Sequence, residues 1–310
     1  MKKITALLLL VIMLVSFMSG CTDDRTVINI GVMSGPTGMS MTKLMADNDE
    51  QNPKYNFTVY STPTTATADI LSKELDMLCL PTNTAATLAN KNPSTLTVLS
   101  INTLGSLYLV TDKDTKINSI KDLEGKTIYA SVPNSTTGPI INYLLKKNDV
   151  NATVEFEPDH DALVARVIKN EVSIAVLPEP KVSVATFKNS DYSVDLNLSE
   201  EWDKVSDTPL TMGCIVVRNE FLEQHKSLVK SFLKEYEASI NYIVDEKNTN
   251  APQMIIDEGV IPAALPVVTS ALNNLRDSIV YLDGRDMKEA LEKFYAAIGV
   301  EAPQDEFYYD

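Results

Sequence analysis

The sequence alternates strand-like and helix-like segments, and this alternation occurs twice in the same order along the chain. The first series occupies residues 27–91, and the second occupies residues 127–188. In each series, short apolar runs alternate with stretches whose apolar residues recur at helical spacing. Strands that alternate with helices predict parallel sheets covered by helices on both faces. We therefore expect an α/β protein built from two similar, doubly wound lobes.

The two series also share residues at corresponding places. A Thr-Gly pair opens the first helix of each series, at Thr37 and at Thr137. Residues 74–81 align without a gap on residues 171–178, and both segments end in Leu-Pro after an apolar strand. Two matches at corresponding positions indicate one architecture that is used twice.

Two further apolar segments flank the second series and predict how the lobes connect. Residues 97–112 have the pattern of a strand, a turn and a second strand, and residues 210–217 form one apolar run. Each segment would carry the chain from one lobe to the other, so together they predict a hinge of two crossovers. Lobe one is then residues 27–105 plus 211–310, and lobe two is residues 106–210.

The N-terminus carries the pattern of an export signal. Two lysines precede an uncharged stretch from residue 4 to residue 18, which is shorter than a membrane span requires. The Met-Ser-Gly-Cys sequence at residues 18–21 resembles the lipobox of bacterial lipoproteins, although Met stands where Leu is usual. The resemblance implies a signal peptide over residues 1–20, lipidation of Cys21 and a tether over residues 21–26. The alternative is an uncleaved anchor helix.

Charge, cysteines and histidines argue against several functions. The 310 residues carry a net charge of −15, which repels nucleic acid. Cys79 and Cys214 lie in apolar strands, where we expect free buried thiols rather than a disulfide, and two thiols make no metal site. The chain has two histidines and no recognisable nucleophile, metal or phosphate-binding motif. We therefore expect no enzymatic activity, no cofactor and no metal.

Three motifs together resemble one family of binding proteins. They are Val-Met-Ser-Gly-Pro-Thr-Gly-Met at residues 32–39, Ile-Lys-Asp-Leu-Glu-Gly-Lys at 120–126 and Val-Leu-Pro-Glu-Pro at 176–180. Over nearly its whole mature length the chain resembles the nitrate/sulfonate/taurine class of ABC-transporter substrate-binding proteins. The resemblance implies a type II periplasmic-binding fold and an ABC permease and ATPase as partners. Members of this class bind nitrate, sulfonates, bicarbonate or thiamine pyrimidine precursors, so the resemblance does not name one ligand.

The combined features predict an extracytoplasmic lipoprotein, anchored to the cell membrane by its N-terminal lipid. We expect a monomer that captures a small polar organic molecule, such as a sulfonate or an aminopyrimidine, in a cleft between the lobes. It would deliver this ligand to an ABC importer. Two alternatives stay open at this stage: a ligand-sensing module for a membrane partner, and an enzyme of cofactor biosynthesis on the same fold.

Candidate ligand-binding residues lie in the turns from strand to helix, where open α/β sheets bind ligands. Helix starts offer free backbone N–H groups, and small or hydroxylated residues allow a ligand to approach them. Hinge residues join the set because the crossovers run behind the cleft. The candidates are Pro36, Thr37, Gly38, Met39, Thr82, Asn83, Asn102, Thr103, Ser135, Thr136, Thr137, Gly138 and Glu179. Taken singly, each turn is explained equally well by helix capping and turn formation.

Glu179 stands between two prolines after an apolar strand, so we expect it at the carboxyl edge of that strand. It either caps the next helix or meets the ligand as the acidic group of the cleft. An ionised Glu179 in the cleft would favour a ligand with a hydrogen-bond donor, such as an amine, an aminopyrimidine or an amino-sulfonate. Of the remaining residues, His160 is expected in a solvated turn, and Trp202 is expected at the surface.

Overall fold

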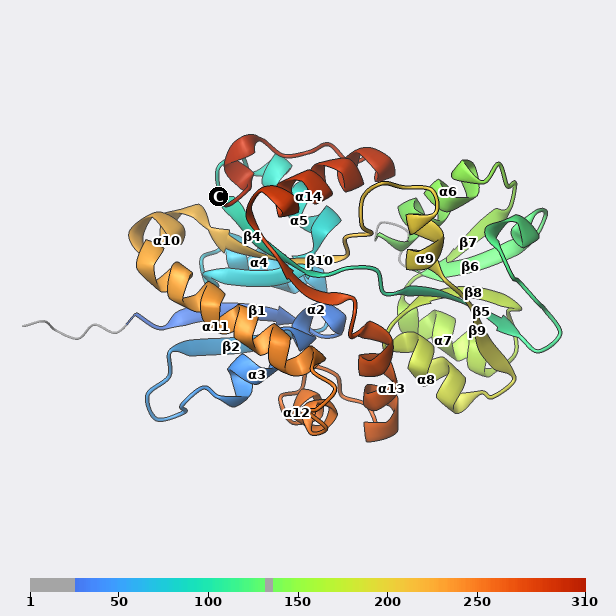
Figure 1. Cartoon of the computed structure of the whole chain (residues 1–310), viewed down its shortest axis with the longest axis horizontal. Coiled ribbons are helices and arrows are strands. Elements are labelled where there is room, and N and C mark those ends of the chain that lie inside the picture. The colour runs from blue at the N-terminus through green and yellow to red at the C-terminus, as the bar shows by residue number, and fades with distance from the viewer. Residues whose placement is uncertain (1–25, 132–135) are drawn as a thin grey trace, which may run out of the picture.

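The computed structural model describes residues 26–131 and 136–310, and the strands form two sheets. The six-stranded sheet has the spatial order β11 (Ile279–Leu282), β4 (Leu96–Thr103), β10 (Gly213–Arg218), β3 (Met77–Pro81), β1 (Ile28–Met33) and β2 (Tyr55–Tyr60). The five-stranded sheet has the order β7 (Thr153–Glu157), β6 (Thr127–Ser131), β8 (Ile174–Pro178), β5 (Leu107–Asp112) and β9 (Tyr192–Asn197). We call the first sheet with its helices lobe one and the second sheet with its helices lobe two; Figure 1 shows them side by side.

The two sheets share one strand order over five strands, and β11 adds a sixth strand to lobe one. In lobe one, β1 pairs in parallel with β2 and β3, and β10 runs antiparallel beside β3. In lobe two, β6 pairs in parallel with β7 and β8, and β5 runs antiparallel beside β8. The antiparallel strand comes in each case from a crossover segment rather than from the strand–helix series of that lobe. The prediction of two doubly wound α/β lobes is confirmed.

The chain passes between the lobes at the two segments predicted as crossovers. β4 ends at Thr103 and β5 begins at Leu107, and this segment spans the middle of the molecule (Figure 1). The return leads from α9 (Leu198–Asp203) to β10. The two boundaries between the lobes, after residue 105 and after residue 210, stay a prediction.

Helices cover both faces of each sheet. In lobe one, α4 (Pro63–Leu71), α5 (Thr82–Lys91) and α14 (Gly284–Ile298) pack on one face, and α3 (Thr42–Ala46), α11 (Lys226–Val244), α12 (Ala251–Asp257) and α13 (Leu265–Leu275) pack on the other. The remaining helices of lobe one are α2 (Pro36–Met39), α10 (Asn219–Gln224) and the 3₁₀ turn η2 (Asp305–Phe307). In lobe two, η1 (Ile120–Leu123) and α6 (Thr137–Lys147) lie opposite α7 (His160–Ile168) and α8 (Lys181–Lys188). Within the two described ranges, no helix is long and apolar enough to cross a membrane.

The first helix of the first series is predicted from the sequence over residues 38–49, and this prediction is wrong in one respect. The chain forms two short helices there, α2 and α3. The break falls at Ser40 and Met41. Ser40 directs its hydroxyl to the Thr37 carbonyl at 2.8 Å, and the same hydroxyl lies 2.6 Å from the Tyr236 hydroxyl on α11. A serine that bonds back to a nearby carbonyl competes with regular helix formation. The first strand-to-helix turn is therefore held by α11 rather than by a continuous helix.

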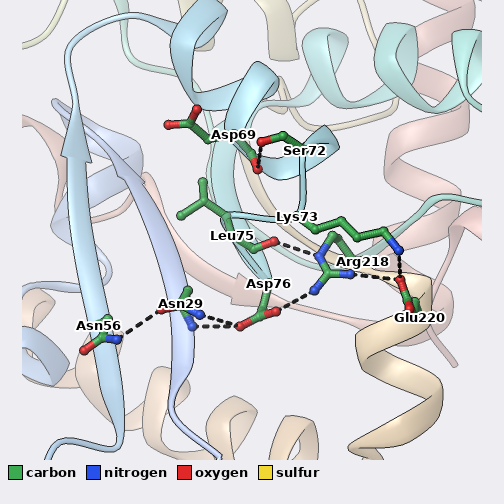
Figure 2. A network of polar contacts seen from close by, with 9 residues as sticks. All are labelled: Asn29, Asn56, Asp69, Ser72, Lys73, Leu75, Asp76, Arg218 and Glu220. Carbon is green, nitrogen blue, oxygen red and sulfur yellow. Dashed lines mark hydrogen bonds and ion pairs between the residues drawn. The ribbon is translucent and has the colours of Figure 1, made fainter.

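One buried ion pair ties three strands of lobe one together (Figure 2). Arg218 at the end of β10 places Nη2 2.7 Å from Asp76 Oδ1 and donates from Nε to the Leu75 carbonyl at 2.8 Å. The other oxygen of Asp76 accepts from the backbone N–H of Asn29 at 2.9 Å. Both partners are mostly buried, so this pair would be costly to break. It lies where β1 and β3 begin, and its charges are therefore satisfied at the sheet edge away from the strand-to-helix turns.

Candidate ligand-binding site

The predicted site residues gather where the parallel strands of both sheets end. β1 and β3 lead into α2 and α5, and β6 and β8 lead into α6 and α8. Parallel strands end at one edge of a sheet, and open α/β sheets bind ligands beyond that edge. Each lobe thus presents two strand-to-helix turns, and α13 of lobe one packs against α8 of lobe two beside them (Figure 1).

In lobe one, Gly213 is the point around which three predicted residues meet. A Cβ atom at this glycine would lie 2.5 Å from Thr37 Oγ1 and 2.6 Å from Asn102 Oδ1. Thr103, next to Asn102, donates from its hydroxyl to the same Oδ1 at 3.0 Å. Only a glycine lets the start of β10 pass this closely. Thr37 is half-buried, and its hydroxyl makes no hydrogen bond to another described residue.

The other lobe-one candidates are largely engaged by their own lobe. Thr82 donates to the Thr211 carbonyl at 3.0 Å, and its own carbonyl accepts from the Tyr295 hydroxyl at 3.1 Å. Asn83 is 9% exposed. Met39 is fully buried in the apolar cluster beneath α11.

Pro36 and Gly38 shape the first turn. Pro36 occupies the first helical position of α2, where its missing N–H costs nothing. A Cβ atom at Gly38 would lie 2.2 Å from the Met33 carbonyl oxygen. Gly38 therefore allows α2 to fold back onto the end of β1.

In lobe two, the candidates at the start of α6 are buried, but only one of them lines a cavity. Thr136 precedes the helix and is 5% exposed, and Thr137 is its first residue. Gly138 lines a cavity of about 950 Å³ between α6 and the C-terminal end of α14. Of the predicted residues that the structure describes, only Gly138 borders this cavity. Ser135, which the sequence also predicts as a site residue, lies outside the described residues.

Glu179 is 1% exposed and is bonded to both lobes. Its Oε2 accepts from the Ser183 backbone N–H at 3.2 Å, in the first turn of α8. Its Oε1 accepts from the Ser183 hydroxyl at 3.0 Å and from Asn274 Nδ2 of lobe one at 2.7 Å. Burial raises the pKa of the Glu179 carboxyl, and these hydrogen bonds oppose the rise. The nearby Lys181 pairs with Asp161 instead, so the carboxyl has no cationic partner among the described residues.

Sequence reasoning missed the residues of α13 that reach across to lobe two. Ser270 places its hydroxyl 3.2 Å from that of Ser183, and the Asn274 carbonyl accepts from the Tyr108 hydroxyl at 3.0 Å. The contacts follow helical spacing, because Glu179 and Ser183 lie four residues apart on lobe two and Asn274 and Ser270 do so on lobe one. Two polar residues four positions apart in a helix, Ser270 and Asn274, were the available signal.

His160 is not in a solvated turn, and that prediction was wrong. It begins α7 after Asp159, whose side chain caps the helix, and it is partly buried. Its Nδ1 lies 2.5 Å from the Ser131 hydroxyl at the end of β6. Burial lowers the pKa of His160, and the nearby Lys181 lowers it further. The imidazole thus stands at the same sheet edge as Thr136 and Glu179.

Trp202 is also misplaced by the sequence prediction, because it is fully buried rather than at the surface. Its ring packs against Tyr143 of α6 and Phe294 of α14, with centroids 4.5 and 5.8 Å away, and its Nε1 donates to the Thr208 carbonyl at 2.7 Å. The acidic residues beside it misled the prediction, since only one face of α9 meets solvent. Trp202 fills the junction between the lobes on the side away from α13.

The two cysteines that the structure describes are free thiols buried beneath this edge. Cys79 and Cys214 are free and buried, and they belong to apolar clusters on opposite faces of the lobe-one sheet. Burial raises the pKa of both thiols. In residues 26–131 and 136–310, no three His, Cys, Asp or Glu side chains gather as metal ligands would.

Comparison with solved structures shows the same fold. An ABC transporter protein from Parabacteroides distasonis has a TM-score of 0.73 at 19% identity, over 92% of this chain and 99% of that one. The ligand-binding component of an ABC-type import system from Staphylococcus aureus, solved with zinc bound, has a TM-score of 0.72 at 14% identity, covering 92% and 96%. The periplasmic aliphatic sulphonate binding protein of Escherichia coli has a TM-score of 0.71 at 11% identity, covering 92% of each chain.

Sequence comparison supplies the family. No curated protein matches the chain. The family model for the periplasmic substrate-binding protein of phosphonate ABC transporters matches residues 50–263. The predicted resemblance to ABC-transporter binding proteins is confirmed. This chain therefore belongs to the family of periplasmic substrate-binding proteins of phosphonate ABC transporters.

Proposed function

We propose that the protein captures a small organic oxyanion, a phosphonate or a sulfonate, that also carries an amine or a similar hydrogen-bond donor. One observation carries this proposal: Glu179 is buried at the junction of the lobes, and none of the residues that the structure describes places a cation beside it. A buried carboxylate without a cation is unfavourable, and a cationic ligand would relieve that cost. The amine would therefore meet Glu179.

The oxyanion would be held by hydroxyls and helix starts. Thr37 offers a hydroxyl without a partner among the described residues, and Thr136 and Thr137 stand at the start of the 11-residue helix α6. His160 stands on the same edge of lobe two and offers a ring nitrogen. N–H groups at helix starts and hydroxyl donors suit an oxyanion. Pro36, Gly38, Met39, Thr82, Asn83, Asn102, Thr103 and Gly138 would shape the walls, and Ser135 belongs to the proposed set by sequence alone.

We further propose the setting in which this capture takes place. The family name places its members in the periplasm as components of phosphonate ABC transporters. The protein would bind its ligand without chemistry, act as a monomer and release the ligand to a permease and its ATPase. Cys21 would carry a lipid that tethers the protein to the membrane, although this residue lies outside the described part of the chain.

Matched ligands test the ligand proposal by titration calorimetry. 2-Aminoethylphosphonate and ethylphosphonate differ in the amine alone, and so do taurine and ethanesulfonate. Because hydrogen bonds to charged groups contribute about 1.5–3 kcal/mol, we expect at least one aminated compound to bind about 10- to 100-fold more tightly than its partner. Equal affinities within both pairs, or binding of nitrate alone, would contradict the proposal.

Mass spectrometry of the native N-terminal peptide tests the anchor. We expect an acylated Cys21 as the first residue and a protein found in the membrane fraction. Cys21→Ala should release the protein from that fraction. An unmodified Met1 at the mature N-terminus would contradict the lipoprotein proposal and favour an uncleaved anchor helix.

A further inference from the structure

Helix α11 supplies the two hydroxyl groups that hold the first strand-to-helix turn of lobe one. The Tyr236 hydroxyl lies 2.6 Å from the Ser40 hydroxyl, and the Ser239 hydroxyl donates to the Ser40 carbonyl at 2.7 Å. Ser239 also accepts from the Leu44 backbone N–H at 3.2 Å. Both hydroxyl residues are buried. The segment from Thr37 to Leu44 is therefore fastened to a helix nearly two hundred residues away in sequence.

The hydrogen bonds around Tyr236 can run in only one direction. The Thr37 carbonyl can only accept, so Ser40 donates its proton there. Ser40 must then accept from the Tyr236 hydroxyl, because its single proton is already used. Burial raises the pKa of Tyr236 well above its ordinary value, so the hydroxyl keeps the proton that it donates.

This direction fixes the amide of Asn102. Since the Tyr236 proton points to Ser40, its oxygen accepts, and Asn102 Nδ2 donates to it at 2.9 Å. The opposite amide orientation would set two acceptors against each other. The amide oxygen, Oδ1, therefore points to Gly213, where Thr37 Oγ1 lies on the other side.

We propose that Tyr236 is a positioning residue for ligand binding, which fixes the Thr37 turn and the Asn102 amide from beneath without touching the ligand. This inference rests on the proposed function, because it assigns Tyr236 to the same site. A role in packing alone needs only the ring, which stacks on Phe232 with centroids 5.4 Å apart and planes at 15°. The hydroxyl is the part that reaches the site.

Removal of single hydroxyls separates the two roles. Tyr236→Phe keeps the ring and its stacking. Tyr55→Phe is the matched control, because Tyr55 also packs on Phe232, at 5.9 Å, but its hydroxyl donates to Glu235 at 3.0 Å, away from the turn. With 2-aminoethylphosphonate and taurine as probes, we expect Tyr236→Phe to weaken binding about three- to tenfold and Tyr55→Phe to leave it unchanged.

A double-mutant cycle identifies the route of the effect. If Tyr236 acts by placing Thr37, its removal should have a much smaller effect in a Thr37→Ala background. Wild-type affinity in Tyr236→Phe, or the same loss in both backgrounds, would overturn the inference.

Side-chain amide exchange tests the same inference without any ligand. The Asn102 amide protons should exchange slowly in the wild type and in Tyr55→Phe, and faster in Tyr236→Phe. Unchanged protection in Tyr236→Phe would overturn the positioning role. If neither probe binds the wild type while this protection is lost as expected, the proposed ligand is wrong and the positioning of Asn102 still stands.

Discussion

Thr82 and Glu179 occupy the same place in the two lobes, yet their side chains are used differently. Each directly follows the Leu-Pro end of the aligned strand. Thr82 donates its N–H to the Met212 carbonyl at 3.1 Å, and Glu179 donates its N–H to the Ser106 carbonyl at 3.0 Å, both on a crossover. The Thr82 hydroxyl then bonds to the same crossover, whereas Glu179 bonds to α8 and to Asn274 of the other lobe.

The strand-to-helix edges of the two lobes therefore have the same backbone arrangement but different roles. The Thr82 turn is bonded entirely within lobe one, so it forms a fixed wall whether or not the lobes meet. The lobe-two edge holds a buried carboxyl whose third hydrogen bond comes from the opposite lobe. Selection by charge and closure of the cleft should therefore both depend on Glu179, while the Thr82 hydroxyl should stabilise the wall that Thr82 helps to shape.

The largest expected effect comes from Glu179→Gln. The variant keeps the size of the side chain but loses the charge that we propose meets the ligand amine. We expect the affinity for the aminated ligand to fall by about 1.5–3 kcal/mol, and the affinity for its ethyl partner to change little. Calorimetry with both compounds measures the difference. Equal losses of affinity for the two ligands would show that Glu179 shapes the cleft and does not bind the ligand amine through its charge.

The same variant should change how stability depends on pH. Folding raises the pKa of Glu179 above its ordinary value of 4.5, so the folded state favours the protonated form. The stability of the wild type without ligand should therefore fall as the pH rises from about 4.5 through the raised pKa. Glu179→Gln should lose this decline. Urea unfolding of both proteins between pH 4 and 8 checks the sign, and parallel curves would argue against a buried, titrating Glu179.

Thr82→Val is expected to have a smaller effect, and to lower stability rather than ligand affinity. The change preserves shape but leaves the buried Thr211 carbonyl without its donor. We expect a loss of about 1–3 kcal/mol in the free energy of unfolding, with ligand affinity unchanged. Thermal unfolding and calorimetry on one preparation measure both quantities. A clear loss of affinity would remove the contrast between the two lobes.

The smallest effect is expected from Asn274→Ala, which removes the bond that crosses to Glu179 but leaves the bonds within lobe two. The closed form without ligand should lose about 0.5–1.5 kcal/mol relative to open forms. Small-angle scattering should then give a larger radius of gyration for the ligand-free variant and the wild-type value with ligand bound. Ser270→Ala, one turn away on α13, serves as a milder comparison. Identical ligand-free curves for Asn274→Ala and wild type would mean that this contact does not hold the lobes together.

The two edges also show what a sequence can and cannot reveal. The doubled strand–helix series and the Leu-Pro alignment predicted both lobes and placed Thr82 and Glu179 at strand ends, because hydrophobic periodicity and turn residues are local properties. The partners of these residues were not predictable in this way. Asn274 and Tyr236 lie in helices whose apolar spacing describes packing only, and their polar contacts depend on how distant segments meet. Trp202 and His160 were misplaced for the same reason, since polar neighbours in sequence do not determine burial.

The central claim is that the buried carboxyl of lobe two receives a cation from the ligand. A cation beside Glu179 lowers its pKa from the raised value, so binding should release protons where the ligand-free carboxyl is partly protonated. Calorimetry of 2-aminoethylphosphonate in two buffers of different ionisation enthalpy, from pH 4.5 upward, counts these protons. Subtracting the count for Glu179→Gln cancels the titration of the phosphonate and of His160. We predict a net release by the wild type relative to the variant, and equal counts for both proteins at every pH would contradict the account.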